Sequence, residues 1–231
     1  MAGQRQSPEL AWGRLAALLA LASLAACADH SVVHKRPVSA PAQRPAALPT
    51  SQSFRQCTAQ LDSAQVRYTP LPNQNNGGGC TVIDAVKLMD IGTPTANLGA
   101  MTCPLAEKFA AWARYAVRPA ARLYFGSEVV RIETFGTYAC RDVRGTGGTI
   151  AGKRSEHASA NAVDVAGFVL ADGRRITVLA DWQGSGPPAQ FLRALRQSAC
   201  RRFPTVLSPD YNAAHRDHFH FDMGGKGGFC R

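Results

Sequence analysis

The sequence predicts an α+β domain in which helices flank an antiparallel sheet. Apolar residues recur at helical spacing in two stretches, near 104–118 and 188–202. An Asp-Gly turn joins two apolar runs over 161–179, a pattern typical of a β-hairpin. Few strands alternate with helices in βαβ order, which disfavours a parallel sheet. With 231 residues, 45% of them hydrophobic, the chain can form one domain with a sizeable core.

The clearest helix begins near Pro104, since a first helical position tolerates proline, whose missing N–H would have no partner there. Pro119 should end or kink this helix. A second helix is predicted over 188–202. The apolar faces of the two helices comprise Leu105, Phe109, Trp112 and Ala116 in the first, and Phe191, Leu192, Leu195 and Ala199 in the second.

The remaining elements are shorter. A helix or turn is expected near 57–65, followed by loop over 68–79. Strands are expected at 82–88, at 129–135 with a continuation over 138–141, at 205–207 and at 217–222, besides the hairpin of 161–170 and 174–179. The glycine-rich stretch 145–148 lacks the strand-to-helix setting of a phosphate-binding loop, and we interpret it as a mobile rim.

The N-terminus has the features of an export signal. Arg5 and Arg14 precede an uncharged run over 15–26, which has the length of a signal-peptide core and is short for a membrane span. The run ends in Leu-Ala-Ala-Cys, which resembles the bacterial lipobox, in which the cysteine, here Cys27, is lipidated. The alternative is an ordinary signal peptide that leaves Cys27 as a spare thiol. Ala28 after the cysteine favours the outer membrane, so we expect an exported lipoprotein anchored at the periplasmic face.

Three segments follow from this organisation: a signal peptide over 1–26, a tether over 27–53 and a folded domain over 54–231. The tether is rich in Pro, Ala, Ser and Gln and has few large apolar residues, so it cannot bury enough surface to fold.

Cysteine usage agrees with export. Six of the seven cysteines remain when Cys27 is set aside, and an even number in an exported chain indicates three disulfides. Six cysteines allow fifteen pairings. Our prediction is Cys57 with Cys80, Cys103 with Cys140, and Cys200 with Cys230. No Cys-x-x-Cys pair occurs, so a thiolate zinc cluster or a redox motif is disfavoured.

The formal charge of +10 favours anionic partners. Nucleic acid is not expected, because an exported chain does not meet it and the arginines are scattered rather than gathered with aromatics into a stripe. Anionic wall polymer and lipid head groups remain as partners.

Four of the six histidines fall in two short clusters, 155–164 and 215–222. In a strand over the second cluster, His218, His220 and Asp222 would point to one face and the two phenylalanines to the other. Asp164 would lie between small alanines that leave room for a metal. A lone histidine is more often a structural hydrogen-bonding group, but imidazole and carboxylate in this grouping predict a zinc site.

The first cluster resembles the Ser-x-His-x-x-Gly-x-Ala-x-Asp motif of the D-Ala-D-Ala carboxypeptidase and lysostaphin-like zinc peptidases, and the later His-x-His resembles their second motif. Within that group, Tyr-Ala-Cys-Arg, Ser-Glu-His-Ala and Asn-Ala-Ala-His-Arg-Asp-His-Phe-His resemble the bacterial extensin-like C-terminal domain family. The resemblance covers most of 57–230 and implies a zinc-peptidase core.

The resemblance also implies roles for residues. His157, Asp164 and His220 would bind one Zn²⁺ per chain, and His218 would be the catalytic histidine beside it. Arg141 would hold a substrate carboxylate or a developing oxyanion through its fork of donors; the alternative is a surface arginine beside a disulfide. His215 would lie outside the ligand set and support it.

Two departures from the motif stand out. Ala160 replaces the usual glycine, so the turn between two ligands loses freedom to adopt positive φ. The Glu-x-x-His pattern that supplies a carboxylate base in some relatives is absent, so His218 would take that role.

The resulting hypothesis is a lipid-anchored zinc hydrolase of peptidoglycan stem peptides or their cross-links, of carboxypeptidase or endopeptidase type. The main alternative is a non-catalytic cell-wall-binding or structural module that retains the metal site. A serine hydrolase using Ser155 or Ser159 is disfavoured, because no Gly-x-Ser-x-Gly elbow occurs.

Overall fold

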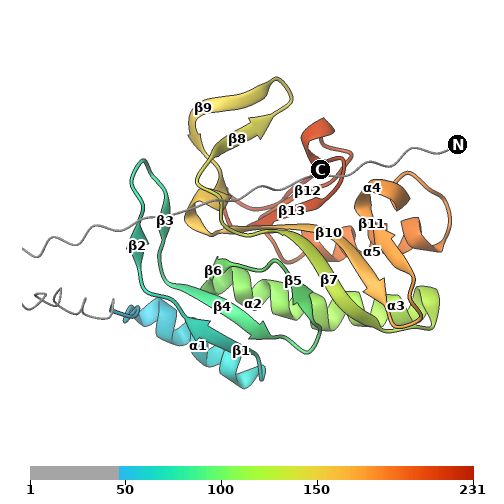
Figure 1. The fold of residues 1–231 in the computed structure, drawn as a ribbon, viewed down its shortest axis with the longest axis horizontal. Helices are drawn as coiled ribbons and strands as arrows, with labels where there is room; N and C mark the ends of the chain where they lie inside the picture. The colour runs from blue at the N-terminus through green and yellow to red at the C-terminus, as the bar shows by residue number, and fades with distance from the viewer. Residues whose placement is uncertain (1–46) are drawn as a thin grey trace, which may run out of the picture. The chain divides into compact units, whose positions relative to one another are not determined.

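A computed structural model describes residues 47–231 (Figure 1). The predicted signal peptide, Cys27 and the tether before residue 47 lie outside the described residues. Within 47–231, no helix is both long and apolar enough to cross a membrane. The fold is mixed α+β, as predicted.

The main sheet has seven strands. Its order is β14-β12-β13-β10-β7-β5, and β11 pairs with β10 on the edge opposite β7. The strands are β5 (Thr95–Ala96), β7 (Val129–Gly136), β10 (Ala162–Leu170), β11 (Arg175–Thr177), β12 (Thr205–Leu207), β13 (Phe219–Asp222) and β14 (Phe229–Cys230). The central pairs are antiparallel, as expected, whereas the short outer strands β5 and β14 pair in parallel with their neighbours.

The predicted hairpin is confirmed. β10 and β11 pair antiparallel around an Asp-Gly turn in which Gly173 has φ +88°, a conformation that glycine adopts without steric cost. The second strand is shorter than predicted, because residues 178–181 begin the short helix α4 (Val178–Asp181). Thr177 caps that helix by accepting a hydrogen bond from the Ala180 N–H at 3.1 Å.

Three smaller sheets correct the prediction for the N-terminal half. β1 (Arg67–Pro70), β4 (Ala85–Asp90) and β6 (Ala100–Thr102) form one, β2 (Gln74–Asn75) and β3 (Thr81–Val82) a second, and β8 (Asp142–Gly145) and β9 (Gly148–Arg154) a third. The expected loop over 68–79 thus contains strands, since pairing with β4 and β3 supplies the hydrogen bonds that the local sequence did not indicate. The expected strand over 82–88 is interrupted at Asp84, where φ is 48°.

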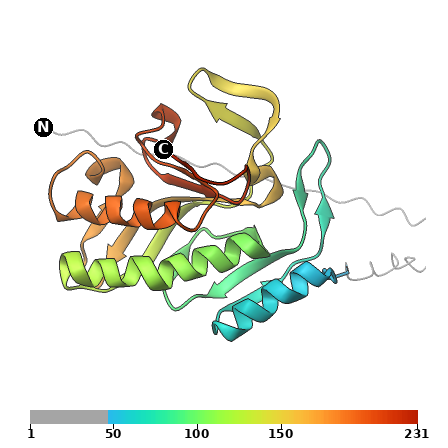
Figure 2. The same ribbon diagram turned by 180° about the vertical axis from the view of Figure 1, so that it is seen from behind.

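The helices begin with α1 (Gln52–Ser63), slightly earlier than the expected 57–65, and continue with α2 (Cys103–Trp112), α3 (Arg118–Phe125) and α5 (Pro187–Cys200). Of the two predicted effects of Pro119, ending or kinking the helix, the first is wrong, because helical structure continues past it. A π-helical turn, Ala113–Val117, joins α2 to α3, and Pro119 lies in the first turn of α3. The wider turn accommodates the missing N–H, so the helix continues beyond the proline, as Figure 2 shows in green.

The core lies between one face of the main sheet and the helices α2, α3 and α5, which Figure 2 shows together on that face. Trp112 of α2 packs against Phe221 of β13, with ring centroids 5.1 Å apart, and Phe168 of β10 packs against Phe191 of α5 at 5.2 Å. Phe219 and Phe221 are fully buried. The predicted alternation of β13 is therefore confirmed, although the strand begins at Phe219 rather than at 217.

The disulfide prediction was wrong for two pairs and is confirmed for one. Cys57 pairs with Cys103, Cys80 with Cys140, and Cys200 with Cys230. Cys57 lies on the face of α1 that packs against α2, where Cys103 begins the helix. The prediction paired cysteines that follow one another in the sequence. It failed because helix packing brings together cysteines that are 46 residues apart.

The segment 137–141 is not a continuation of β7, which corrects another prediction. Gly136 has φ +126°, and the chain leaves the sheet there. The glycine-rich stretch 145–148 is the turn of the β8–β9 hairpin, which stands above the main sheet in Figure 1.

Candidate metal centre

The three predicted ligands lie on two neighbouring strands and a short turn. Asp164 in β10 is the direct register partner of His220 in β13, so the antiparallel pairing brings them together. His157 comes from the 3₁₀ turn Glu156–Ser159, just before β10. This turn ends at Ala160, which has φ 54°. The alanine thus adopts the left-handed conformation that the motif's glycine would take more easily.

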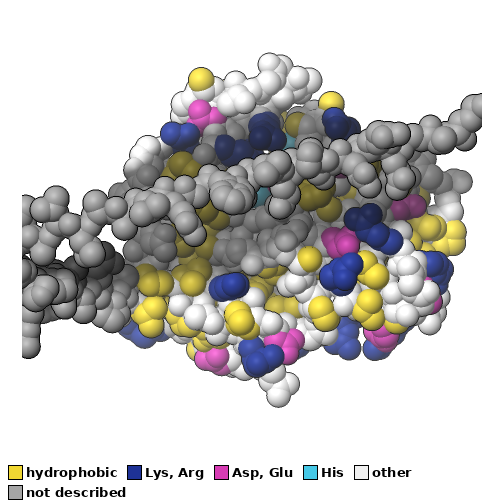
Figure 3. Space-filling model, in the orientation of Figure 1, with side chains coloured by type: hydrophobic (Ala, Val, Ile, Leu, Met, Phe, Trp, Pro, Cys, Tyr) yellow, Lys and Arg dark blue, Asp and Glu magenta, His cyan; other side chains and the backbone are white. Residues whose placement is uncertain are grey.

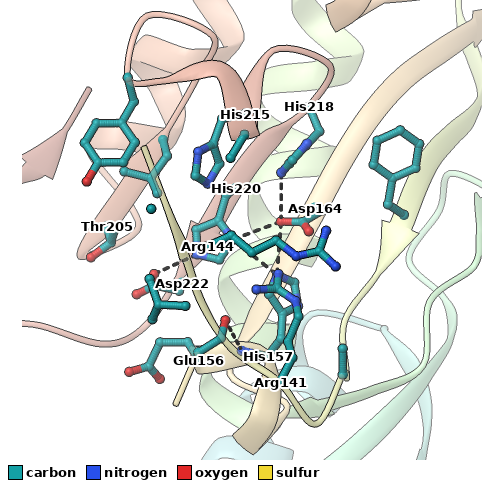
Figure 4. A pocket seen from close by; sticks show the side chains of 18 of the residues that line it. Arg141, Arg144, Glu156, His157, Asp164, Thr205, His215, His218, His220 and Asp222 are labelled. Atoms are coloured by element: carbon teal, nitrogen blue, oxygen red, sulfur yellow. Dashed lines mark hydrogen bonds and ion pairs between the residues drawn. The ribbon is translucent and has the colours of Figure 1, made fainter. Parts of the chain in front are cut away.

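Three donor atoms converge at this point (Figure 4). His157 Nε2 lies 3.1 Å from Asp164 Oδ1 and 3.2 Å from His220 Nδ1, and His220 Nδ1 lies 2.9 Å from Asp164 Oδ1. Ligands held ~2.0–2.2 Å from a tetrahedral zinc ion stand roughly 3.3–3.6 Å apart. The cluster is therefore slightly tighter than the spacing of zinc ligands, and small side-chain rotations would be needed to admit the ion.

Outer hydrogen bonds orient both imidazoles. His157 Nδ1 lies 3.0 Å from the Thr137 carbonyl oxygen, which can only accept, so Nδ1 carries a proton and Nε2 faces Asp164 and His220. His220 Nε2 lies 2.8 Å from Asp222 Oδ2 and donates to it, which turns Nδ1 toward Asp164. A metal-ligating histidine typically donates its other ring N–H to a carbonyl or carboxylate in this way. The donor set therefore fits a metal ion.

The electrostatics of the cluster favour positive charge at its centre. Burial alone would lower the pKa of His220, but hydrogen bonds to Asp164 and Asp222 outweigh it and raise this pKa to about 9. Burial would raise the pKa of Asp164, but hydrogen bonds from His157 and His220 hold it well below its usual range. Asp164 is therefore a carboxylate at neutral pH, as a metal ligand must be.

His218 lies beside the cluster. Its Nε2 is 3.5 Å from Asp164 Oδ1, and its Nδ1 donates to Asp217 Oδ1 at 2.8 Å. Phe135 contacts the ring edge-on, with centroids 5.7 Å apart. The carboxylate at Nδ1 orients the ring so that Nε2 faces the cluster.

His215 lies outside the proposed ligand set, as the sequence analysis expected. Its ring centroid lies 5.8 Å from that of His220, and its Nδ1 donates to Asn212 Oδ1 at 2.7 Å. Burial, together with the charges of His218 and His220, lowers its pKa to about 4. His215 is therefore a neutral imidazole that fills the wall of the site.

Arg141 follows Cys140 in the segment after β7 and lines the same cleft, which has a volume of about 700 Å³. Partial burial lowers its pKa, whereas the charge of Asp164 raises it. Figure 4 shows Arg141 and Arg144 in the space next to Asp164 and the histidines. All five predicted site residues, His157, Asp164, His218, His220 and Arg141, thus line one cleft.

The sequence analysis missed two groups at the candidate site, the Thr137 carbonyl and Arg144. The Thr137 carbonyl is a backbone atom in an irregular segment, and no sequence signal marks it. Arg144 lies just before the stretch 145–148 that was interpreted as a rim, although its position three residues after Arg141 in a basic chain was a usable signal.

Fold and site together define an α+β protein with a buried His-Asp-His cluster that could hold a metal ion. A family model described as Extensin-like protein C-terminus matches residues 55–231. The chain belongs to this family. No curated protein and no solved structure matches the chain.

Proposed function

We propose that this protein is a zinc-dependent hydrolase of peptidoglycan peptide bonds, related to the D-Ala-D-Ala carboxypeptidase and lysostaphin-like zinc peptidases. The observation that carries the proposal is the convergence of three potential ligand atoms, His157 Nε2, Asp164 Oδ1 and His220 Nδ1, within 3.2 Å of one another, with both imidazoles oriented from outside.

His157, Asp164 and His220 would hold the ion. Zinc in such a site supplies Lewis acidity and makes water a usable nucleophile near neutral pH. His218 Nε2 would accept the proton of the attacking water, and Asp217 would stabilise the imidazolium that forms. Arg141 would donate to the carbonyl oxygen as negative charge develops on it.

The proposed cellular location rests on the signal peptide and the lipobox predicted at the N-terminus. An acyl chain on Cys27 would anchor the protein to the membrane at the periplasmic face, preferably of the outer membrane, without a spanning helix. The tether would let the domain reach the wall, and the basic chain suits an anionic polymer.

The first test measures metal and cleavage together. The purified mature protein should contain one zinc ion per chain and release new products from isolated sacculi, detected by mass spectrometry. Asp164→Asn should lose both the bound zinc and the cleavage activity, since an amide oxygen is a poorer zinc ligand than a carboxylate. Asp62→Asn serves as the control, because that carboxylate accepts from the Tyr68 hydroxyl at 3.0 Å and lies outside the cleft.

The same experiment separates the hydrolase from a wall-binding module. A hydrolase gives products with the wild type and none with His218→Ala, although both contain zinc. A module without turnover gives no products with either protein while both sediment with sacculi, and that result would refute the hydrolase.

A further inference from the structure

Two neighbouring helices carry positive charge without negative charge. The helical residues 113–125, which comprise the π-helical turn and α3, and residues 187–202, which comprise α5 and the two residues after it, contain no Asp or Glu. Their arginines are Arg114, Arg118, Arg122, Arg193, Arg196, Arg201 and Arg202. Figure 3 views the opposite face, where Asp and Glu side chains lie next to Lys and Arg side chains in several places. The two helices thus differ from that face in presenting cations alone.

α3 and α5 lie side by side over the main sheet, as Figure 2 shows. Tyr124 and Phe125 of α3 contact Phe191 of α5, with ring centroids 6.4 and 5.1 Å apart. Arg193 and Arg201 are exposed on the outward side of α5. We call the outward surface of residues 113–125 and 187–202 the helix face. Its arginines therefore act together on whatever approaches this side of the domain.

Most of these arginines lack an acidic partner. Arg122 pairs with Glu128. The others form no ion pair with a carboxylate of residues 47–231. Backbone carbonyls accept hydrogen bonds from the side chains of Arg114, Arg193 and Arg202. Arg118 and Arg201 make no side-chain hydrogen bond within the described part of the chain. The helix face therefore has uncompensated positive charge that attracts an anionic surface.

Two large side chains project from the helix face among the arginines. Leu123 is 79% exposed and Tyr115 is 65% exposed, the highest values among the large hydrophobic residues that the structure describes. Each follows an arginine in sequence, Arg122 and Arg114 respectively. A membrane interface accepts apolar side chains just below the level of cationic ones, whereas a soluble polyanion gains little from an exposed leucine. The combination favours a lipid surface over a soluble polymer.

The helix face and the cleft lie on opposite sides of the main sheet. Phe219 and Phe221 of β13 pack toward the helices, whereas His220 and Asp222 alternate with them and face the candidate metal centre. A membrane on the helix side therefore leaves the cleft open. The first described helix, α1, packs against α2 and is linked to it by a disulfide, so the chain that precedes α1 also joins the domain on the helix side.

We propose that the helix face docks on an anionic lipid membrane, with its arginines at the phosphate head groups and with Leu123 and Tyr115 at the edge of the acyl region. This inference goes beyond the proposed hydrolase function and does not depend on it. The contact adds to the acyl chain predicted on Cys27, because a basic patch strengthens the binding of a lipid anchor. It orients the domain so that the cleft is directed away from the membrane.

The test uses the mature chain with Cys27→Ser, which removes the acylation site, and measures co-sedimentation with lipid vesicles. One set of vesicles contains phosphatidylcholine alone, and the other contains an equal mixture of phosphatidylcholine and phosphatidylglycerol. We expect binding to the anionic vesicles to be at least about tenfold tighter than to the neutral ones. Binding should weaken as salt is raised, because salt screens the attraction between exposed charges.

The combined variant Arg118→Gln/Arg201→Gln should weaken binding to the anionic vesicles by about tenfold or more, since each arginine near such a surface contributes roughly fivefold. The matched control is Arg131→Gln/Arg175→Gln, which removes two exposed arginines from β7 and β11 of the main sheet. It changes the net charge equally and should bind as tightly as the parent chain. Leu123→Ser should weaken binding by about threefold or more without a change of charge. Circular dichroism checks that each variant is folded.

Three results would overturn the proposal. The first is the lack of a preference for the anionic vesicles. The second is equal weakening by the two combined variants, since net charge rather than the helix face would then account for the binding. The third uses soluble polyphosphate as a competitor. If polyphosphate binds the chain as tightly as the anionic vesicles do, and Leu123→Ser affects neither interaction, the helix face takes a soluble polyanion and lipid docking is rejected.

Discussion

The alanine at position 160 adopts a conformation that alanine disfavours. Its φ of 54° costs roughly 1–2 kcal/mol relative to a right-handed residue, yet its methyl group is fully buried against Val82 and Ala85. Glycine would remove the strain but would lose burial of one methyl group, about 0.8 kcal/mol, and gain unfolded-state entropy of about 0.4–1 kcal/mol.

These opposing effects give a prediction for position 160. Ala160→Gly should change the free energy of unfolding by less than about 1 kcal/mol, measured by urea denaturation. Ala160→Val should destabilise by more than about 2 kcal/mol, because a β-branched residue at positive φ is strained and the site has no free volume. A valine variant as stable as the wild type would contradict the positive φ at position 160.

The two aspartates that contact histidines provide a second residue-scale prediction. Asp222 contacts His220, a proposed ligand, whereas Asp217 contacts His218, which lies outside the proposed ligand set. Asp222→Asn should lower zinc affinity by about 10–100-fold, the usual effect of losing such an outer contact. Asp217→Asn should leave zinc affinity unchanged and lower kcat. Competition with a metal-sensitive dye measures the affinities, and equal effects of the two variants would contradict the assignment.

At the scale of elements, the β2–β3 hairpin supports the candidate metal site. The Cys80–Cys140 disulfide, the Asn76 amide donating to the Tyr138 hydroxyl at 2.7 Å, and the backbone bond from Ala139 N to the His157 carbonyl at 3.1 Å all act on segment 137–141. That segment supplies the Thr137 carbonyl that orients His157. Holding segment 137–141 in place therefore also holds His157, a proposed ligand, in place.

Two disulfides of similar loop length make this testable. Cys80–Cys140 closes 60 residues and Cys57–Cys103 closes 46, so removing either should cost a similar ~4 kcal/mol through unfolded-state entropy. Only the Cys80→Ser/Cys140→Ser pair should also weaken zinc binding, by tenfold or more. Equilibrium dialysis under conditions where both variants are folded gives the comparison, and equal zinc affinities would show that the hairpin does not position the site.

At the scale of the whole molecule, metal binding should couple to stability. An ion that binds only the folded state stabilises it by about 4.1 kcal/mol at a thousandfold excess over Kd. For a domain of this size, that corresponds to a Tm higher by roughly 10 °C. Chelation should lower Tm by this amount and zinc should restore it, as calorimetry can measure. Asp164→Asn should show no response to either treatment.

The sequence predicted the site better than it predicted the fold around it. His157, Asp164, His218 and His220 line one cleft, and their residue types, the period of two in β13 and the short turn before β10 could be predicted because they are local properties. The hairpin at Asp172-Gly173 and the buried helix faces were predictable for the same reason. Three other features could not be predicted, since each depends on a partner distant in sequence. They are the strands within 68–79, the continuation of the helix past Pro119 and two of the disulfides.

The sequence by itself determined which side chains are candidates for metal binding and catalysis, because residue type and strand or helix periodicity are properties of short stretches. Tertiary structure alone decided that Asp164 lies opposite His220, that a Thr137 carbonyl orients His157, and that Arg141 and Arg144 share a cleft with them. These relations arise from strand register and from packing between segments dozens of residues apart. Their free energy comes from burial and hydrogen bonding over the whole domain, which no short stretch of sequence contains.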